Sequence, residues 1–272
     1  MQTRWGRTLA AITVEKWIDD RQANGSYTFL RSDAVTDSGR SAEAVKKAIQ
    51  RLARRGRVIK VKDYFYVIVP LEYQNAGGPP AAWFIHDLMD AMQLPYYVGI
   101  LTAAAQYGAS HQQPQEFQVV TDRSVRPLTV GRTRIRFFAS QYAAEAAVAS
   151  IKTPTGTMRV ATPETTAVDL VRFAKAAGNL DNVATVLAEL SSLLDAKRLL
   201  AAVRLVGDVP NAKRLGYLLD HVRARRVCGP VHAWIERQSC QPVPLQAGRP
   251  VAGAPEDRRW HVLVNEPVEV EA

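Results

Sequence analysis

Cysteine and long apolar runs are scarce in this chain. Only two cysteines occur among 272 residues, Cys228 and Cys240, so the sequence excludes the disulfide framework that stabilises small secreted domains. Apolar runs such as Ala143–Ala149 are short and interrupted by Glu145, whereas a bilayer span needs about 20 apolar residues. Near the N-terminus, Glu15 interrupts any signal-peptide core. These absences predict a cytoplasmic protein without a membrane span.

Motifs of common enzyme chemistry are also missing. Gly77-Gly78 lacks the lysine and the following helix of a phosphate-binding loop, and no Gly-x-Ser-x-Gly nucleophile elbow occurs. Cys228, His232 and Cys240 could supply metal ligands, but their spacing matches no standard zinc pattern. A buried thiol and a surface histidine are the simpler interpretation. The sequence therefore predicts no enzyme, no metal and no cofactor.

Positive charge is concentrated near the N-terminus. The net charge is +9, and residues 1–70 contain 14 Lys and Arg against 7 Asp and Glu, which leaves +7 in this quarter of the chain. From Arg40 to Lys62 there are nine basic residues and one acidic residue, Glu43. Such a segment suits a polyanion such as nucleic acid, although a solvated helix face has the same composition. The local pattern must decide between them.

The first 40 residues contain signals for two helices. Apolar residues at helical spacing predict a helix over Thr8–Ala23, which Asn24-Gly25 ends. Tyr27–Leu30 is strand-like, and Ser32 or Asp33 can cap a short second helix over residues 34–35. A turn at residues 37–39 follows.

A basic helix comes next, with Ser41 as its N-cap and Gly56 at its end. Its apolar stripe comprises Val45, Ala48, Ile49 and Leu52. The opposite face and its flanks carry Arg40, Glu43, Lys46, Lys47, Gln50, Arg51 and Arg54. A helix with one packed stripe and one basic, amide-bearing face fits the major groove of DNA, where Arg and Lys donate to guanine and Gln pairs with adenine.

A β-hairpin is predicted over Arg57–Val69, with a charged turn at Lys62-Asp63. The order helix, short helix, basic helix and hairpin is typical of a winged helix-turn-helix, in which the third helix enters the major groove and the wing contacts phosphate or the minor groove. The candidate DNA-binding residues are Arg40, Ser41, Glu43, Lys46, Lys47, Gln50, Arg51, Arg54, Arg57, Lys60 and Lys62. A small helical domain with an incidental basic helix is the alternative. Four features in the expected order favour DNA binding.

The fold class predicted from these patterns is α+β, with a winged helix-turn-helix domain at residues 1–71 and a larger mixed α/β domain at residues 81–272. Residues 72–80 are rich in Gly and Pro and are predicted to be the linker. In the larger domain, the main helices expected are Ala81–Gln93, Tyr96–Gly108, Pro163–Phe173, Asn182–Val206 and Asn211–Val222, and the strands expected are Phe117–Thr121, Leu128–Val130, Thr133–Phe138 and Trp260–Val264.

Three segments carry a resemblance to a known family. Tyr96–Gly108 reads Tyr-Tyr-Val-Gly followed by an alanine-rich stretch, Phe117–Thr121 reads Phe-Gln-Val-Val-Thr, and Thr162–Leu170 begins Thr-Pro-Glu-Thr-Thr. With the preceding basic segment, they resemble the AbiEi antitoxin family of type IV toxin–antitoxin systems and abortive phage infection. The resemblance extends over roughly Thr8–Val222.

The resemblance implies a function in two parts. Family members bind inverted repeats in their own promoter through the winged domain and act as autorepressors. The C-terminal domain neutralises a toxin, a nucleotidyltransferase of the AbiEii type, and in type IV systems it does so without a stable complex. The groove-reading helix of the family then corresponds to Ser41–Arg55, and its wing to Arg57–Val69. A toxin partner and promoter DNA are thus expected, and a membrane partner is not.

Two other functions remain open on the sequence alone. A winged-helix repressor unrelated to a toxin would bind a small ligand in its C-terminal domain, and a pocket with convergent polar groups would favour it. A nucleic-acid enzyme would need clustered carboxylates or a metal site in that domain, and the spacing of residues indicates neither. A basic patch at Arg132, Arg134 and Arg136 is interpreted as a solvated strand face rather than a site for a toxin or RNA.

Overall fold

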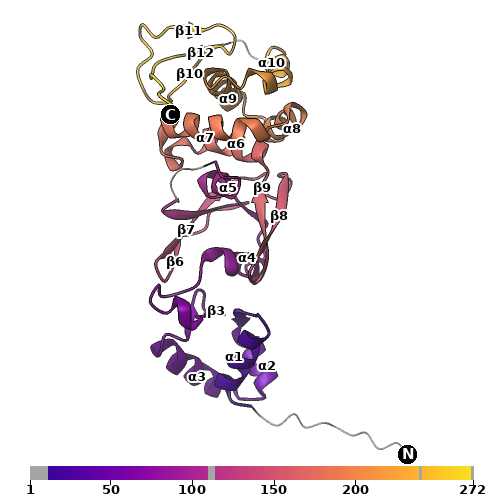
Figure 1. The fold of residues 1–272 in the computed structure, drawn as a ribbon, viewed down its shortest axis with the longest axis vertical. Helices are drawn as coiled ribbons and strands as arrows, with labels where there is room; N and C mark the ends of the chain where they lie inside the picture. Colours follow the sequence, from indigo (N-terminus) through magenta and orange to yellow (C-terminus); the bar gives the residue numbers. More distant parts are fainter. Residues whose placement is uncertain (1–11, 110–113, 239–240, 271–272) are drawn as a thin grey trace, which may run out of the picture. The chain divides into compact units, whose positions relative to one another are not determined.

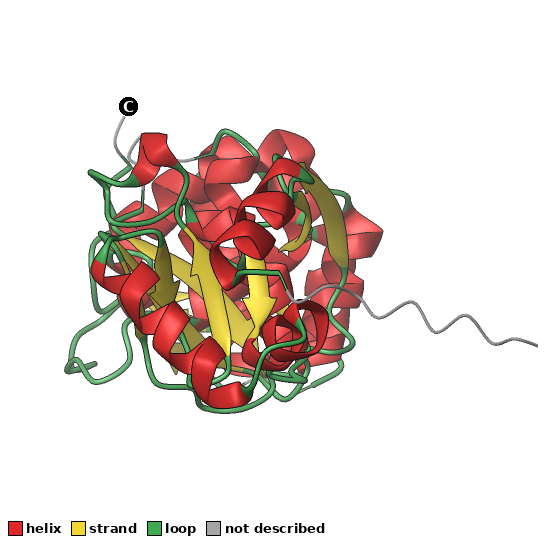
Figure 2. Ribbon diagram, turned by 90° about the horizontal axis from the view of Figure 1, so that it is seen from below, coloured by secondary structure: helices red, strands yellow, loops and turns green. Residues whose placement is uncertain are grey.

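The computed structural model describes residues 12–109, 114–238 and 241–270. Helices and strands occur throughout (Figure 2), which confirms the predicted α+β class. The chain divides into two compact units. The first contains the described parts of residues 1–94, 127–135 and 152–158, and the second contains the described parts of residues 95–126, 136–151 and 159–272.

The first unit begins with three helices and three short strands (Figure 1). In chain order they are α1 (Val14–Ala23), β1 (Thr28–Leu30), α2 (Arg31–Ser38), α3 (Ala42–Arg54), β2 (Val58–Lys60) and β3 (Phe65–Ile68). The strands form an antiparallel sheet in the order β1-β3-β2, with Phe29 opposite Tyr66 and Ile59 opposite Val67. The elements follow one another in the order predicted from the sequence.

Helix α1 begins later than predicted. Ile12 and Thr13 are not helical, and Thr8–Ala11 lie outside the described residues. The Thr13 side chain accepts a hydrogen bond from the Lys16 backbone at 3.2 Å, which caps the helix. Because an extended residue with a hydroxyl satisfies the free N–H groups of the first turn, Thr13 is a better start than any apolar residue before it.

Helix α2 is longer than predicted, and its cap is different. Leu30 is the N-cap residue, and its backbone N–H donates to the Asp33 carboxylate at 3.2 Å, so the prediction that Ser32 or Asp33 is the N-cap was wrong. The helix continues through Asp37 and Ser38, which were predicted to form a turn. It ends at Gly39, whose φ of 64° is a left-handed conformation that glycine adopts without strain.

A single core holds these elements together. The apolar stripe of α3 is fully buried, as predicted, and packs in one cluster with Trp17 and Ile18 of α1. Phe29 lies at the centre of an aromatic group, edge-on to Trp17 with ring centroids 5.3 Å apart and stacked on Tyr66 at 5.2 Å. Burial of so many apolar side chains fixes α3 against its neighbours.

The segment after the hairpin is ordered by contacts within the first unit. A 3₁₀ helix spans Leu71–Tyr73, and the Arg132 backbone donates to the Ala76 carbonyl at 3.1 Å. Gly131 has a φ of 58°, and a Cβ there would lie 2.5 Å from the Gly77 backbone, so this close approach requires glycine. The predicted helix Ala81–Gln93 is broken at Phe84 into a 3₁₀ turn and α4 (Ile85–Ala91).

Six further strands form one sheet, in the order β6-β7-β5-β4-β9-β8. They are β4 (Tyr96–Val98), β5 (Glu116–Thr121), β6 (Leu128–Val130), β7 (Thr133–Ala139), β8 (Val148–Thr153) and β9 (Gly156–Ala161). Strand β4 is antiparallel to β5, with Tyr97 opposite Val120, and parallel to β9 through Val98 and Val160. The predicted strands at residues 117–121, 128–130 and 133–138 are all present.

The predicted helix Tyr96–Gly108 was wrong in its first third. Tyr96–Val98 is the central strand β4, Gly99 is extended with φ −130° and ψ −174°, and the helix α5 covers only Ile100–Gln106. Aromatic and β-branched residues favour a strand when a partner strand is available, and β5 and β9 supply two. The alanine-rich part alone forms the helix.

Helices of the second unit surround α6 (Pro163–Arg172), which packs against α5, α7 (Asn179–Leu190), α8 (Ala196–Val206) and α9 (Val209–His221) (Figure 1). Thr162 caps α6, as predicted. The predicted helix Asn182–Val206 was wrong, because Asp195 accepts hydrogen bonds from the Lys197 and Arg198 backbones at 2.9 Å and starts α8 as a separate helix. None of the described helices is long and apolar enough to cross a membrane.

The C-terminal segment forms a small sheet on α9. Its strands are β10 (Val243–Pro244), β11 (Glu256–Asp257) and β12 (Val262–Leu263), after the helix α10 (Gly229–Ile235). Of the predicted strand Trp260–Val264, only Val262–Leu263 is a strand. Trp260 is fully buried, and its indole N–H donates to Asp220 at 3.0 Å. Trp260 therefore anchors the C-terminal segment to α9 through its buried ring and this hydrogen bond.

Candidate nucleic-acid interface

Helix α3 is positioned by its cap and its core face. The Ser41 side chain accepts a hydrogen bond from the Ala44 backbone at 3.3 Å, as the sequence predicted. Val45, Ile49 and Leu52 are at most 3% exposed, so the helix cannot rotate without breaking the core. Its remaining side chains are therefore presented on one defined face.

The structure places the predicted α3 residues on the surface. The exposed members are Arg40, Ser41, Glu43, Lys46, Lys47, Gln50, Arg51 and Arg54. At about 100° per residue, Lys47, Gln50 and Arg54 lie opposite the buried stripe, and Lys46 and Arg51 flank them. On the hairpin, Lys60 is exposed, whereas Arg57 and Lys62 are half-buried.

Some of these cations already have acidic partners. Lys47 lies 3.7 Å from Glu43 one turn earlier, with both side chains more than 60% exposed, so this ion pair is weak. Arg57 lies 2.6 Å from Asp19 of α1, so its charge is partly neutralised and its side chain is held beside α1. Among the described residues, Lys46, Arg51 and Arg54 form no ion pair. These three retain their full charge for a partner.

The hairpin tip contains a local ion pair. Lys60 lies 3.0 Å from Asp63, and this hydrogen bond and charge raise the pKa of Lys60 and lower the pKa of Asp63. Asp63 therefore neutralises part of the positive charge of the predicted wing. Lys62, next to it, has no such partner among the described residues.

Two exposed cations of this region were missed by the sequence analysis. Arg31 starts α2, and its backbone donates to the Tyr64 carbonyl at 2.9 Å, which places it beside the hairpin tip. Arg55 is the C-cap of α3 and forms an ion pair with Glu15 at 3.2 Å. The strand pairing that brings Arg31 to Tyr64 joins residues far apart in the sequence, so periodicity alone could not indicate it.

A buried polar group lies in the second unit. The Tyr97 hydroxyl donates to Asp169 at 2.8 Å, and Arg172 lies 3.3 Å from the same carboxylate. Burial raises the pKa of Asp169 to about 6, although the Arg172 charge and the Tyr97 hydrogen bond oppose the shift. The group links β4 to α6. Tyr97 and Asp169 lie in two segments that carry the sequence resemblance.

No described group of three His, Cys, Asp or Glu side chains is arranged to hold a metal ion. Cys228 is buried, and burial raises the pKa of its thiol to about 12, so it is protonated at neutral pH. His232 lies 3.7 Å from Glu236. Cys240, the third residue of the possible metal set, lies outside the described residues.

The family comparison concerns the middle of the chain. Residues 97–221 match the model of the AbiEi antitoxin C-terminal domain. This segment is similar to an AbiEi antitoxin C-terminal domain and makes up less than half of the chain. The match confirms the resemblance noted in the sequence over β4 to α9 and supports an antitoxin role in a toxin–antitoxin system. The N-terminal elements α1 to β3 lie outside the matched AbiEi segment.

A solved structure shares the fold over most of the chain. It is the crystal structure of the RV2827C protein from Mycobacterium tuberculosis, with a TM-score of 0.66 and 14% sequence identity. The alignment covers 92% of this chain and 90% of that one, so the likeness includes the N-terminal elements as well as the AbiEi domain. At this identity it shows the fold alone. Among curated proteins, none matches this sequence significantly.

Proposed function

We propose that this protein is the antitoxin of a type IV, AbiE-like toxin–antitoxin system that represses its own promoter. Residues 1–71 bind inverted repeats in duplex DNA as a winged helix-turn-helix, and residues 81–272 neutralise a nucleotidyltransferase toxin. The supporting observation is a rigidly packed helix α3 with an exposed basic face, in a chain that carries an AbiEi domain.

The face of α3 has the chemistry that duplex DNA requires. Arg51, Arg54 and Lys46 offer charged donors to phosphates and guanine edges, and Gln50 offers the amide that pairs with adenine. The hairpin beside α3 carries Lys60 and Lys62, which suit phosphate contacts because they add charge without a fixed base-reading geometry. The helix thus reads sequence, and the hairpin adds affinity.

The toxin part of the proposal rests on the AbiEi domain. It requires no stable complex between the two proteins, because the family resemblance implies neutralisation without one. It also requires no reaction catalysed by this chain.

An experiment in cells separates the two parts. The chain is expressed with the nucleotidyltransferase encoded beside it and with a reporter driven by its own promoter. We expect wild type to restore growth and repress the reporter. The variant with Lys47→Ala and Arg54→Ala should restore growth but release the reporter, because both changes lie in the predicted DNA-binding domain. A neighbouring gene that is harmless alone would contradict the antitoxin proposal.

A ligand-responsive repressor is a second candidate, and one observation favours it. The second unit contains a cavity of about 540 Å³, which lies in the range of small-molecule sites. If the protein responded to such a ligand instead of serving a toxin, the reporter would respond to the ligand and growth would not depend on the neighbouring gene.

A further inference from the structure

The 540 Å³ cavity lies wholly within the second unit and is bounded by β7, the end of α6, α9 and the segment after β10. Four of its lining residues are cations: Arg136, Arg172, Lys175 and Arg214. Among the described residues that line it, none carries a carboxylate. The cavity is therefore surrounded by basic groups from four different elements, namely β7, α6, the 3₁₀ turn at Ala174–Ala176 and α9.

Acidic neighbours cancel only part of this charge. Arg136 is paired with Glu116 at 3.4 Å, and Arg172 with Asp169 at 3.3 Å. Arg214 instead donates to two neutral oxygens, the Pro244 carbonyl at 2.9 Å and the Asn211 side chain at 2.8 Å. Lys175 is exposed.

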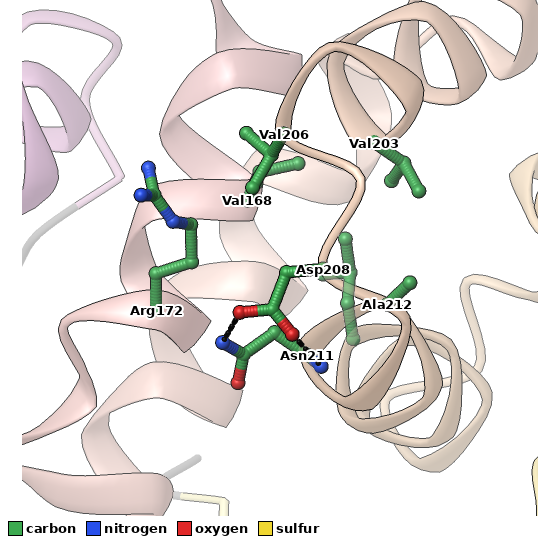
Figure 3. Close-up of a pocket in the computed structure, with 8 residues that line it drawn as sticks. Val168, Arg172, Val203, Val206, Asp208, Asn211 and Ala212 are labelled. Atoms are coloured by element: carbon green, nitrogen blue, oxygen red, sulfur yellow. Dashed lines mark hydrogen bonds between the residues drawn. The ribbon is translucent and has the colours of Figure 1, made fainter. Parts of the chain in front are cut away.

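Asp208, the carboxylate whose charge acts on Arg214, is already hydrogen-bonded to another residue. Asp208 accepts hydrogen bonds from the Asn211 side chain at 2.6 Å and from the Asn211 backbone at 3.0 Å (Figure 3). Burial lowers the pKa of Arg214, and Asp208 only partly opposes that effect. The guanidinium of Arg214 is thus held in place without a direct acidic partner among the described residues, and an anion in the cavity would supply one.

Aromatic rings form the other part of the lining. The Phe138 and Phe173 rings have centroids 5.1 Å apart. The Arg136 guanidinium lies 4.9 Å from the centre of the Phe138 ring, and the Arg172 guanidinium lies 5.1 Å from that of Phe173. These contacts hold the planar cations in fixed orientations, so less entropy is lost when they bind a ligand.

We propose that this cavity binds a nucleoside triphosphate. A polyphosphate can contact several cations at once, and no carboxylate of the described residues lines the cavity to repel it. Arg is suited to phosphate because its donors form a planar fork. The volume exceeds the needs of a phosphate chain alone, and the aromatic lining offers a place for a planar base. The site uses none of the residues assigned to DNA, so it is independent of the proposed function.

Calorimetry on the full-length chain tests the proposal, with ATP and GTP as ligands. Tripolyphosphate tests the charged part without a base, and adenosine and guanosine test the base without phosphate. We expect one triphosphate to bind per chain, at least about tenfold more tightly than tripolyphosphate or either nucleoside. No binding of either triphosphate, or equally tight binding of tripolyphosphate, would overturn the proposal.

Variants show whether the cavity is the site. The double variant Arg136→Gln, Lys175→Gln should weaken triphosphate binding by about tenfold or more. The control double variant Arg198→Gln, Arg204→Gln removes two exposed charges from α8, outside the cavity, and should bind as wild type does. If the first double variant does not fold, Lys175→Gln alone replaces it. If both double variants weaken triphosphate binding equally, the cavity is not the site. If duplex DNA displaces the bound triphosphate, the triphosphate occupies the DNA-binding surface instead, which would also contradict the assignment.

Discussion

At the scale of single residues, α3 and the hairpin present different sets of hydrogen-bond donors. Lys47, Gln50 and Arg54 lie opposite a fully buried stripe, so their donors point in a common direction. Lys60 and Lys62 lie on a short hairpin, where Asp63 holds one of them in an ion pair. Groups that read bases and groups that contact phosphate respond differently to mutation, and this difference can be measured.

Replacing Gln50 with alanine should affect sequence preference more than charge. If Gln50 pairs with an adenine, Gln50→Ala costs about 1–3 kcal/mol on the promoter sequence and removes the preference at one base position. The dependence of affinity on salt should not change, because no charge is lost. Binding to the promoter and to its single-base variants measures both. Equal losses on every sequence would contradict the base-reading role.

Replacing Lys62 should affect all sequences alike. Lys62→Ala is expected to weaken binding uniformly and to reduce the salt dependence by about one phosphate contact. Asp63→Asn should have the opposite effect, because it releases Lys60 from its ion pair. Titrations at several salt concentrations test the pair. If neither variant changes the salt slope, the hairpin does not contact phosphate.

Asp169 should make stability depend on pH. Its folded pKa is raised to about 6, mainly by burial, whereas an unfolded aspartate titrates near about 4. The stabilisation from its proton is complete below about pH 4 and is lost as the pH rises through about 6. From about pH 4 to about pH 7, wild type should therefore lose about 3 kcal/mol of unfolding free energy relative to Asp169→Asn. Urea unfolding measures the difference, and a constant difference would refute the raised pKa.

At the scale of elements, local signals in the sequence predicted the parts that local chemistry determines. Ser41 and Thr162 were recognised as caps because a hydroxyl before an apolar run satisfies the first N–H groups of a helix. The buried stripe of α3 followed from its spacing. The same spacing predicted which residues of the candidate interface are exposed, because they lie on the side of α3 opposite the buried stripe.

Elements that depend on distant partners could not be predicted in this way. Tyr96–Val98 is a strand because β5 and β9 lie on either side of it, and its local sequence also permits a helix. Arg31 reaches the hairpin tip through the pairing of β1 with β3. The cationic cavity combines Arg136 with Arg214, which no spacing rule connects. Tertiary contacts decide all three cases.

The contact between α9 and Trp260 gives a prediction at this scale. A Cβ at Gly216 would lie 2.2 Å from the Trp260 ring. Gly216→Ala should therefore destabilise the fold by about 1–3 kcal/mol or more, although alanine is the better helix former. Arg204→Ala is the control, because it introduces an alanine at an exposed position of α8. Thermal unfolding of both variants measures the effect, and equal melting temperatures would contradict this packing.

At the scale of the whole molecule, charge and family likeness fall on different parts of the chain. Residues 1–70 carry +7 of the net charge of +9, whereas the AbiEi domain covers residues 97–221. This separation favours one segment for DNA and another for the toxin. The cationic cavity is lined only by residues outside the basic N-terminal segment, so a ligand there need not compete with DNA for the same residues.

The central claim is that the exposed face of α3 binds the promoter. Fluorescence anisotropy of a labelled duplex from the protein's own promoter tests it, with the full-length chain at several salt concentrations. Wild type should bind tightly and with strong salt dependence, and the Lys47→Ala, Arg54→Ala variant should lose at least about tenfold in affinity. The Arg198→Ala, Arg204→Ala variant, which loses the same charge from α8, should bind like wild type. Promoter binding that survives the α3 changes would contradict the account.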